Sequence, residues 1–395
     1  MNACFTHHGD GAFLEQADAK NLLPEVQPFI QMGGEAFIID AGWYGAKQWS
    51  ACMGDWRYSR EKYPDGFRPI ADPLKAAGSA FGIWFAPEVL NEGAPLITEH
   101  PEWVRDSEQE GYLQNRGKVL RMEIPEARLW LLSQVEELIN EQGMTLYRQD
   151  GCNHESDLRE GEADNRRGIR EIQYIRGLYA MQDELRKRHP QLVMEAALGA
   201  PRIDLETLSR FHWHQPCESW LHPGLDQCQT YGTSLWMPGG SLVFYNQSTD
   251  NYGLWSGFGG QLSVAWEPSD PGFSVEAARR QLDLYKRVRV FLSGDFYPLT
   301  PISLEEAWMG YQFHRLDLKS GCAFVFKRVK SPQVMYPEDE TFNLQLTGLA
   351  PGSRYRVHFA SSSRDTTSTG AELAKGIVLN LGAPPTAELV IYQAI

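Results

Sequence analysis

Residues 127–150 read ARLWLLSQVEELINEQGMTLYRQD and join a helical pattern to a short apolar run. Residues 127–142 have the amphipathic composition of a helix, and Thr145–Arg148 has the composition of a buried strand. Helical stretches and β-type runs alternate in the same way through the first 300 or so residues. Alternation of this kind predicts βαβ units and a parallel sheet.

The number of β-type runs predicts how this sheet closes. A (β/α)8 TIM barrel needs eight parallel strands and about 250 residues or more. The predicted strands are Asn2–Thr6, Ala36–Asp40, Phe81–Phe85, Thr145–Arg148, Leu192–Ala196, Phe211–His214, Leu242–Tyr245 and Leu262–Trp266. The clearest predicted helices are Ala127–Gln142, Gly168–His189 and Val275–Leu292. We therefore expect an α/β fold with a catalytic barrel over residues 1–302.

The pattern changes after Pro298–Pro301. From Gly310 onwards, apolar runs follow one another at short intervals, with Gly, Pro, Asp and Ser between them and no visible helical period. This pattern predicts a small C-terminal antiparallel β-sandwich, over residues 303–395. Its predicted strands are Gly321–Lys327, Thr341–Leu346, Tyr355–Phe359, Gly376–Leu381 and Ala387–Tyr392.

The composition excludes several kinds of partner. The chain carries 51 acidic and 37 basic residues and a net charge of −14, so phosphate backbones and anionic lipids would repel it. No run approaches the 18 or so consecutive apolar residues of a membrane span. The start, MNACFTHHGD, lacks the basic and apolar regions of a secretory signal, and the six cysteines form no CxxC pair. We expect a cytoplasmic protein with reduced thiols that binds neither nucleic acid nor membranes.

Polar and aromatic residues follow the predicted strands, where a parallel barrel places its active site. Twelve Trp among 12% aromatic residues suit a sugar site, although a large core would also use them. The residues at these strand ends are Asp40, Trp43, Asp55, Trp56, Trp84, Glu88, Arg148, Asp150, Arg202, Asp204, His212, His214 and Glu218. Two carboxylates from different strands are the minimum set for glycoside hydrolysis. A single Asp at a strand end is more often a helix cap or an ion-pair partner, so the argument depends on their convergence.

Eight short motifs occur in order along the chain. They are DAGWYG (40–45), GDW (54–56), WFAPE (84–88), HPEW (100–103), YRQD (147–150), RIDLETL (202–208), TYGTSLW (230–236) and YPLTP (297–301). Together they resemble the α-galactosidases of glycoside hydrolase family 36. The resemblance covers nearly the whole chain, including YQFHR (311–315) and GAEL (370–373).

The resemblance implies a retaining double displacement without a metal or organic cofactor. Asp150 corresponds to the nucleophile of the family, and Glu218 stands where the acid/base is expected. The substrate would be a small or oligosaccharide α-glycoside. The oligomeric state is left open, with a homo-oligomer as one option. The residues expected to bind the sugar are Asp40, Trp43, Asp55, Trp56, Trp84, Arg148 and Arg202.

The sequence also departs from the family pattern. From its start at the first predicted barrel strand, we expect the chain to lack the family's large N-terminal β-domain. The family's CASGGR run is replaced by residues 196–201, so the sugar that fills the subsite is open. The family's Asp-x-Asn at the fourth strand reads Asp150-Gly-Cys-Asn153. Glu218 replaces an Asp and Pro216 an Arg. Retention needs carboxyl groups about 5–5.5 Å apart and inversion about 6.5–9.5 Å, so the longer Glu leaves the stereochemical outcome open.

Other functions fit parts of this pattern. The departures suit a sugar-binding barrel that has lost catalysis, or a glycosidase with changed sugar specificity or with transglycosylation. His7, His8, His212 and His214 could supply imidazole ligands to a metal, although a hydrogen-bonded polar histidine is the commoner explanation. Cys217, next to Glu218, is read as a small buried residue rather than a nucleophile.

Overall fold

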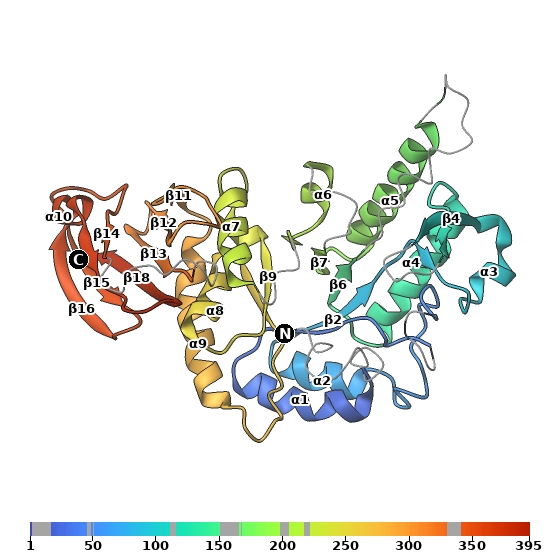
Figure 1. Ribbon diagram of the computed structural model, residues 1–395. Coiled ribbons are helices and arrows are strands. Elements are labelled where there is room, and N and C mark those ends of the chain that lie inside the picture. The colour runs from blue at the N-terminus through green and yellow to red at the C-terminus, as the bar shows by residue number, and fades with distance from the viewer. Residues whose placement is uncertain are drawn as a thin grey trace. The chain divides into compact units, whose positions relative to one another are not determined.

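The computed structural model describes residues 1, 17–45, 49, 51–110, 116–150, 166, 168–197, 205–216, 222–329 and 341–395. The chain forms two compact units (Figure 1). The first comprises Met1–Gln215 and Ala265–Arg279, and the second comprises Pro216–Val264 and Arg280–Ile395. These units do not test the expected division after residue 302, which stays a prediction.

A parallel sheet forms the core of the first unit. In the described residues it has five strands in the order β1 (Ala36–Ile39), β2 (Ala80–Phe85), β6 (Leu146–Gln149), β7 (Val193–Ala196) and β8 (Trp213–His214). Every neighbouring pair is parallel. These strands confirm the second to sixth predicted strands, and the first, Asn2–Thr6, lies outside the described residues.

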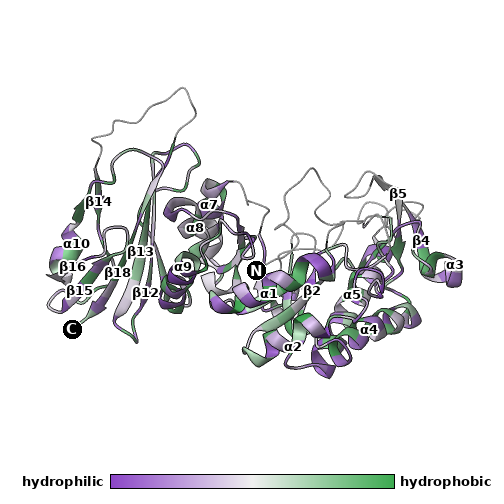
Figure 2. Ribbon diagram, turned by 90° about the horizontal axis from the view of Figure 1, so that it is seen from below, coloured by the Kyte–Doolittle hydropathy of each residue, from purple (hydrophilic) through white to green (hydrophobic). Residues whose placement is uncertain are grey.

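Helices alternate with these strands, as expected for βαβ units. They are α1 (Ala19–Gln31), α2 (Arg68–Ala76), α4 (Pro125–Asn140), α5 (Ile169–Arg188) and α6 (Leu205–Arg210). Helix α2 lies against β2 (Figure 1). Helix α4 begins with Pro125 at its first position and buries Leu131, Val135 and Leu138 at helical spacing. Figure 2 shows hydrophilic and hydrophobic residues on both α2 and α4, the mixture expected where one face of a helix covers a sheet.

An insertion follows β2 before the chain reaches α4. It contains β3 (Val89–Leu90), α3 (Leu96–Glu99), the 3-10 turn η2 (Pro101–Trp103), β4 (Val104–Glu110) and β5 (Arg116–Leu120). The three strands form a small antiparallel sheet in the order β3-β5-β4. This insertion fixes the backbone just beyond the carboxyl end of β2.

The register of the parallel sheet decides which side chains face the site. Trp84, Arg148, Glu195 and Trp213 stand at matching positions of β2, β6, β7 and β8 and therefore share one face. Gln149 points to the other face, where Gln182 of α5 donates a hydrogen bond of 3.2 Å to its side chain. Because α5 covers that face, Arg148 and Asp150 point away from the helix layer.

The second unit contains a further parallel pair, β9 (Val243–Asn246) and β10 (Gln261–Val264), which confirms the last two predicted strands. Helices and turns surround the pair: α7 (Pro223–Ser234), η5 (Gly239–Ser241), α8 (Asn251–Ser256), η6 (Gly257–Gly259), α9 (Val275–Val288) and η7 (Arg289–Phe291). Helix α9 begins in the first unit and ends in the second. In the described part of the chain, no helix is long and apolar enough to cross a membrane.

The C-terminal region is antiparallel, as predicted. One sheet has the order β11 (Asp295–Pro298), β12 (Trp308–Arg315), β13 (Ser320–Lys327), β18 (Thr386–Ala394), β15 (Arg354–Phe359) and β16 (Arg364–Thr369). A second sheet pairs β14 (Phe342–Leu344) with β17 (Ile377–Leu379). Val325 and Val390 of the first sheet share a buried cluster with Leu344 and Leu379 of the second, so the two sheets pack as layers.

This region differs from the expectation in the unpredicted strands β11, β12 and β16 and in one helix. Strand β12 is buried almost throughout, and its polar residues Gln312 and His314 are buried on the distant Tyr392, a partner that the sequence does not show. Strand β16 has a polar sequence, RDTTST, without an apolar run. The region also contains a helix, α10 (Gly370–Lys375), which is too short to show a period. It begins with a capping box in which Thr369 and Glu372 each bond the other's backbone, and this local signal could have been found in the sequence.

Candidate active site

The structure describes seven of the nine residues expected to act on substrate: Asp40, Trp43, Asp55, Trp56, Trp84, Arg148 and Asp150. All seven belong to the first unit. Arg202 and Glu218 lie outside the described residues, as do His7, His8, Asp204 and Cys217.

Asp150 lies directly after β6 and is held by the neighbouring strand β2. Its backbone N–H donates to the carbonyl of Phe85 at 2.7 Å. The indole Nε1 of Trp84 donates to Oδ2 of Asp150 at 3.1 Å. The Asp150 side chain is half-buried. Two consecutive residues of β2 therefore fix where this carboxylate lies and how it is turned.

Arg148, two residues earlier, is the centre of a buried polar network. Its guanidinium donates to Glu195 and, at 2.8 Å, to Oε1 of Gln215, and its Nε lies 3.5 Å from Oδ2 of Asp40. Arg148 is 2% exposed and Glu195 is 1% exposed. The network joins the ends of β1, β6, β7 and β8. The structure thus brings Arg148 and Asp40 together, and the role of Arg148 as a sugar ligand stays a prediction.

Glu195 and Gln215 were not among the expected site residues, although the sequence contained a signal for Glu195. It interrupts the otherwise apolar run VMEA, and its position in β7 is in register with Arg148 of β6. A carboxylate within a buried strand needs a cationic or hydrogen-bonding partner, so the pairing of these two strands implies the pairing of their charges.

Four rings, Trp43, Tyr44, Trp56 and Trp84, form an aromatic wall beside Asp150. Tyr44 stacks on Trp84 with ring centroids 6.4 Å apart, and Trp56 lies 5.2 Å from Tyr44 and 6.3 Å from Trp84. Nε1 of Trp43 donates to the carbonyl of Trp84 at 2.8 Å, so the Trp43 ring is fixed to the backbone of β2.

Two polar atoms of the aromatic wall have no partner among the described residues: the Tyr44 hydroxyl and Nε1 of Trp56. Burial raises the pKa of Tyr44 well above its ordinary value, and the charges of Asp40 and Asp150 raise it further, so the hydroxyl stays protonated. Buried polar atoms normally find a partner. All four rings are at most 5% exposed, so the wall is a buried support beside Asp150 that also holds two hydrogen-bond donors without a described partner.

Glu88 is a second carboxyl group near Asp150. It is 1% exposed, and burial raises its pKa to about 8; a hydrogen bond to its own backbone opposes the rise and the negative charge of Asp150 adds to it. Asp55 lies in a different environment. Its side chain is 24% exposed and accepts a hydrogen bond of 2.7 Å from Nε of Arg57.

The two histidines of the expected sixth strand, His212 and His214, lie in different environments. His212 is exposed, and its Nδ1 accepts a hydrogen bond of 3.0 Å from the backbone of Met194. His214 is 1% exposed, and burial lowers its pKa to about 4. Among the residues that the structure describes, no group of three or more His, Cys, Asp and Glu side chains could hold a metal ion.

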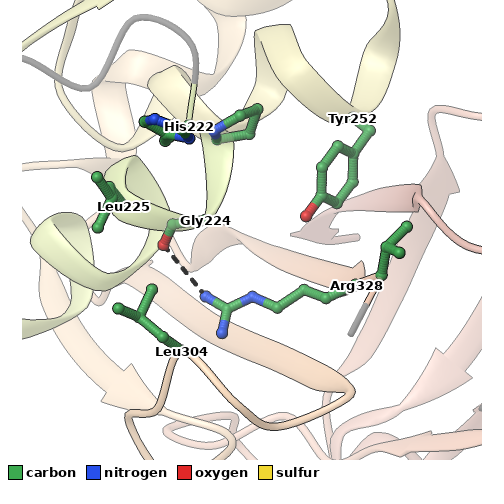
Figure 3. Close-up of a pocket in the computed structure, with 8 residues that line it drawn as sticks. His222, Gly224, Leu225, Tyr252, Leu304 and Arg328 are labelled. Carbon is green, nitrogen blue, oxygen red and sulfur yellow. Dashed lines mark hydrogen bonds between the residues drawn. The ribbon is translucent and has the colours of Figure 1, made fainter. Parts of the chain in front are cut away.

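A pocket of about 420 Å³ lies in the second unit and is lined by none of the expected residues (Figure 3). Tyr252, the exposed Leu304 and the buried Arg328 contribute to its lining. Arg328 donates to the carbonyls of Gly224 and Ser303 and to Oε1 of Gln227. Because its guanidinium binds the protein's own oxygens, this pocket is a weaker candidate than the residues around Asp150.

Comparison with known proteins supports the same interpretation. The profile of the family described as Melibiase matches residues 15–245. An α-galactosidase of Escherichia coli is 36% identical over 186 residues, which are 46% of this chain and 25% of that protein. α-Galactosidase C of Emericella nidulans is 27% identical over 89% of this chain and 47% of its own length. The chain thus spans about half or less of the curated relatives it matches.

Solved structures share the fold. A variant of the GH36 α-galactosidase AgaA from Geobacillus stearothermophilus, in complex with raffinose, superposes with a TM-score of 0.79 at 18% identity. The match covers 100% of this chain and 55% of the other. It confirms the predicted fold class, an α/β domain of the TIM-barrel type followed by an antiparallel β-sheet region.

Proposed function

Because the chain belongs to the Melibiase family, we propose that it is a glycoside hydrolase that cleaves α-galactosides, with Asp150 as nucleophile and Glu218 as acid/base. The observation that carries the proposal is the hydrogen bond from Nε1 of Trp84 to Asp150 at the end of β6. It orients a carboxylate beside the aromatic wall at the end of a parallel strand, where barrel enzymes carry their chemistry.

The proposed reaction has two steps. Asp150 attacks the anomeric carbon while Glu218 gives its proton to the leaving oxygen, so that a C–O bond to Asp150 forms as the glycosidic bond breaks. Glu218, now ionised, takes a proton from water, and the resulting hydroxide displaces Asp150. Galactose leaves with its configuration retained, and both carboxyl groups return to their starting charge.

The aromatic wall supports a sugar as the substrate. The wall lies next to Asp150, and two of its donors without a described partner, the Tyr44 hydroxyl and the Trp56 indole, would suit sugar hydroxyls. Since the AgaA variant was solved with raffinose, we include raffinose-type oligosaccharides among the proposed substrates.

The described cysteines, Cys52, Cys228 and Cys322, are free thiols, which supports a cytoplasmic site of action.

Azide rescue tests both roles with 4-nitrophenyl α-galactoside. Asp150→Gly should lose turnover, and added azide should attack from the face opposite the leaving group and give β-galactosyl azide. Glu218→Gly should lose at least about 100-fold in turnover, and azide should displace Asp150 from the covalent intermediate to give α-galactosyl azide. The exposed Asp72→Asn is the matched control and should keep full activity.

The outcome also separates the alternative functions. Full activity in either glycine variant would overturn that residue's role. Galactose binding by wild-type protein without turnover of any activated glycoside would favour the sugar-binding barrel.

A further inference from the structure

Glu88 is a buried carboxyl group for which the proposed reaction has no use. It lies between β2 and β3, and its backbone carbonyl accepts a hydrogen bond of 2.8 Å from the backbone of Leu120 on β5. The N–H of Val89 closes the same turn onto the carbonyl of Ala86 at 3.0 Å. The turn is thus held from both sides. Within the described residues, Oε2 of Glu88 has no hydrogen-bond partner.

The groups that face Glu88 come from β6 and α5. They are Asp150 at the end of β6, Tyr147 within β6, and Tyr174 of α5. No cation is among these described neighbours. An ionised Glu88 would place a second negative charge in a buried position beside Asp150, which is strongly unfavourable.

We propose that Glu88 is a positioning residue, a buried carboxylic acid that the β2–β3 turn holds beside Asp150 and that stays uncharged there, so that no second negative charge opposes the nucleophile. This inference rests on the proposed function, because it concerns the nucleophile of that reaction. The Glu88 pKa of about 8 supports it, since the group is then neutral at pH 7.

The charge of Glu88 affects the second step of the reaction. When the covalent intermediate is hydrolysed, the ester at Asp150 becomes a carboxylate and a negative charge returns to that position. A neutral Glu88 does not oppose this change. An ionised Glu88 repels the returning charge and slows deglycosylation, so kcat should fall as Glu88 loses its proton.

The first experiment compares the pH dependence of kcat for the wild type, Glu88→Gln and the exposed control Glu92→Gln. The wild type and control should lose about tenfold in kcat by pH 9, one unit above the Glu88 pKa. Glu88→Gln should keep its rate over this range, because the amide is permanently neutral. A decline in Glu88→Gln that matches the wild type would overturn the proposal.

The second experiment needs no substrate. Because the pKa of Glu88 is higher in the folded state than its ordinary 4.5, the wild type should lose stability relative to Glu88→Gln as pH rises from 4.5 to about 8. A stability difference that does not change with pH would overturn the role of Glu88. The expected pH-dependent difference, in a protein that hydrolyses no α-galactoside, would instead overturn the proposed function.

A third measurement covers the case in which Glu88→Gln does not fold. The infrared spectrum of the wild type at pH 7 should contain the C=O stretch of a buried protonated carboxyl group, and this band should disappear above pH 9. Its absence at pH 7 would overturn the proposal.

Discussion

Trp84 joins the aromatic wall to the proposed nucleophile through a single N–H group, so the effect of that hydrogen bond can be tested separately. Trp84→Phe keeps an aromatic ring but removes the donor to Oδ2 of Asp150. Since a hydrogen bond to a charged group contributes about 1.5–3 kcal/mol, we expect kcat to fall by roughly 10- to 100-fold. KM should change less, because most of the ring face remains.

Steady-state kinetics on an aryl α-galactoside measure this effect, with Trp236→Phe as the control because Trp236 is 55% exposed. An unchanged kcat in Trp84→Phe would show that Asp150 is oriented by other groups.

The ion pair of Arg148 and Glu195 is the second test at the scale of the residue. Both side chains are almost fully buried, and removing one partner leaves the other charge without its main counterion. We expect Glu195→Gln to lower the free energy of unfolding by about 3 kcal/mol or more. Glu195→Gln combined with Arg148→Met should cost less than the sum of the two single changes.

Urea unfolding measures these differences, and Glu184→Gln is the matched control. Glu184 pairs with Arg188 on the exposed face of α5 and should contribute nothing measurable. Equal losses from the buried and the exposed change would contradict a stabilising role for the Arg148–Glu195 pair.

Helix α5 contains Gly177, although glycine is unfavourable inside a helix. A Cβ on Gly177 would lie 1.9 Å from the backbone oxygen of Met122, so the helix and this segment approach each other too closely for any side chain. Gly177→Ala should therefore destabilise the protein, although alanine is better by about 1 kcal/mol in an unconstrained helix. Gly232→Ala in α7 is the control, because its Cβ would meet only Ile302 at 3.6 Å.

Thermal unfolding separates the two variants: Gly177→Ala should melt below the wild type, and Gly232→Ala at or above it. Similar behaviour of both would show that the close approach in α5 relaxes without cost.

Helices and strands whose sequence signal lies within the element itself could be predicted from the sequence. Those whose burial depends on residues of a distant element could not. The β-type runs of the parallel strands are apolar because helices or other strands cover them, so their positions were correct for each described strand. Strand β12 is equally buried but carries Gln312 and His314, whose side chains both bond Tyr392 of the distant β18. Those polar residues can be buried only because that partner exists, and the sequence does not show which residue it is.

The candidate site follows the same rule at the scale of the whole molecule. Asp40, Trp84, Arg148 and Asp150 could be found because each follows or ends a strand of the alternating pattern. The arrangement among them could not: that Arg148 binds Glu195, and that Trp84 binds Asp150, depends on the register between strands. Register is set by the folded sheet, so the sequence identified the residues of the site but not their hydrogen-bond partners.

Two buried groups of opposite behaviour should shape the pH dependence of the whole protein. His214 has a folded-state pKa of about 4 against its ordinary 6.5, so its contribution to stability is complete above pH 6.5 and is lost as pH falls towards 4. Glu88 has a folded-state pKa of about 8 against 4.5, so its contribution is complete below pH 4.5 and is lost as pH rises towards 8. Between pH 4.5 and 6.5 the two changes oppose each other. The free energy of unfolding should therefore be level there and fall on both sides, more so on the alkaline side, where the net charge of −14 adds repulsion.

Urea unfolding from pH 4 to 9 tests this profile, and two variants separate its limbs. His214→Gln should weaken the decline on the acid side without changing the alkaline side, and Glu88→Gln should do the reverse. If both variants kept the wild-type profile, the pH dependence would come from the exposed carboxylates and histidines, and the buried site would not control it. If each variant flattened only its own limb, the neutral states of His214, in β8, and of Glu88, in the turn after β2, would be properties that the fold imposes.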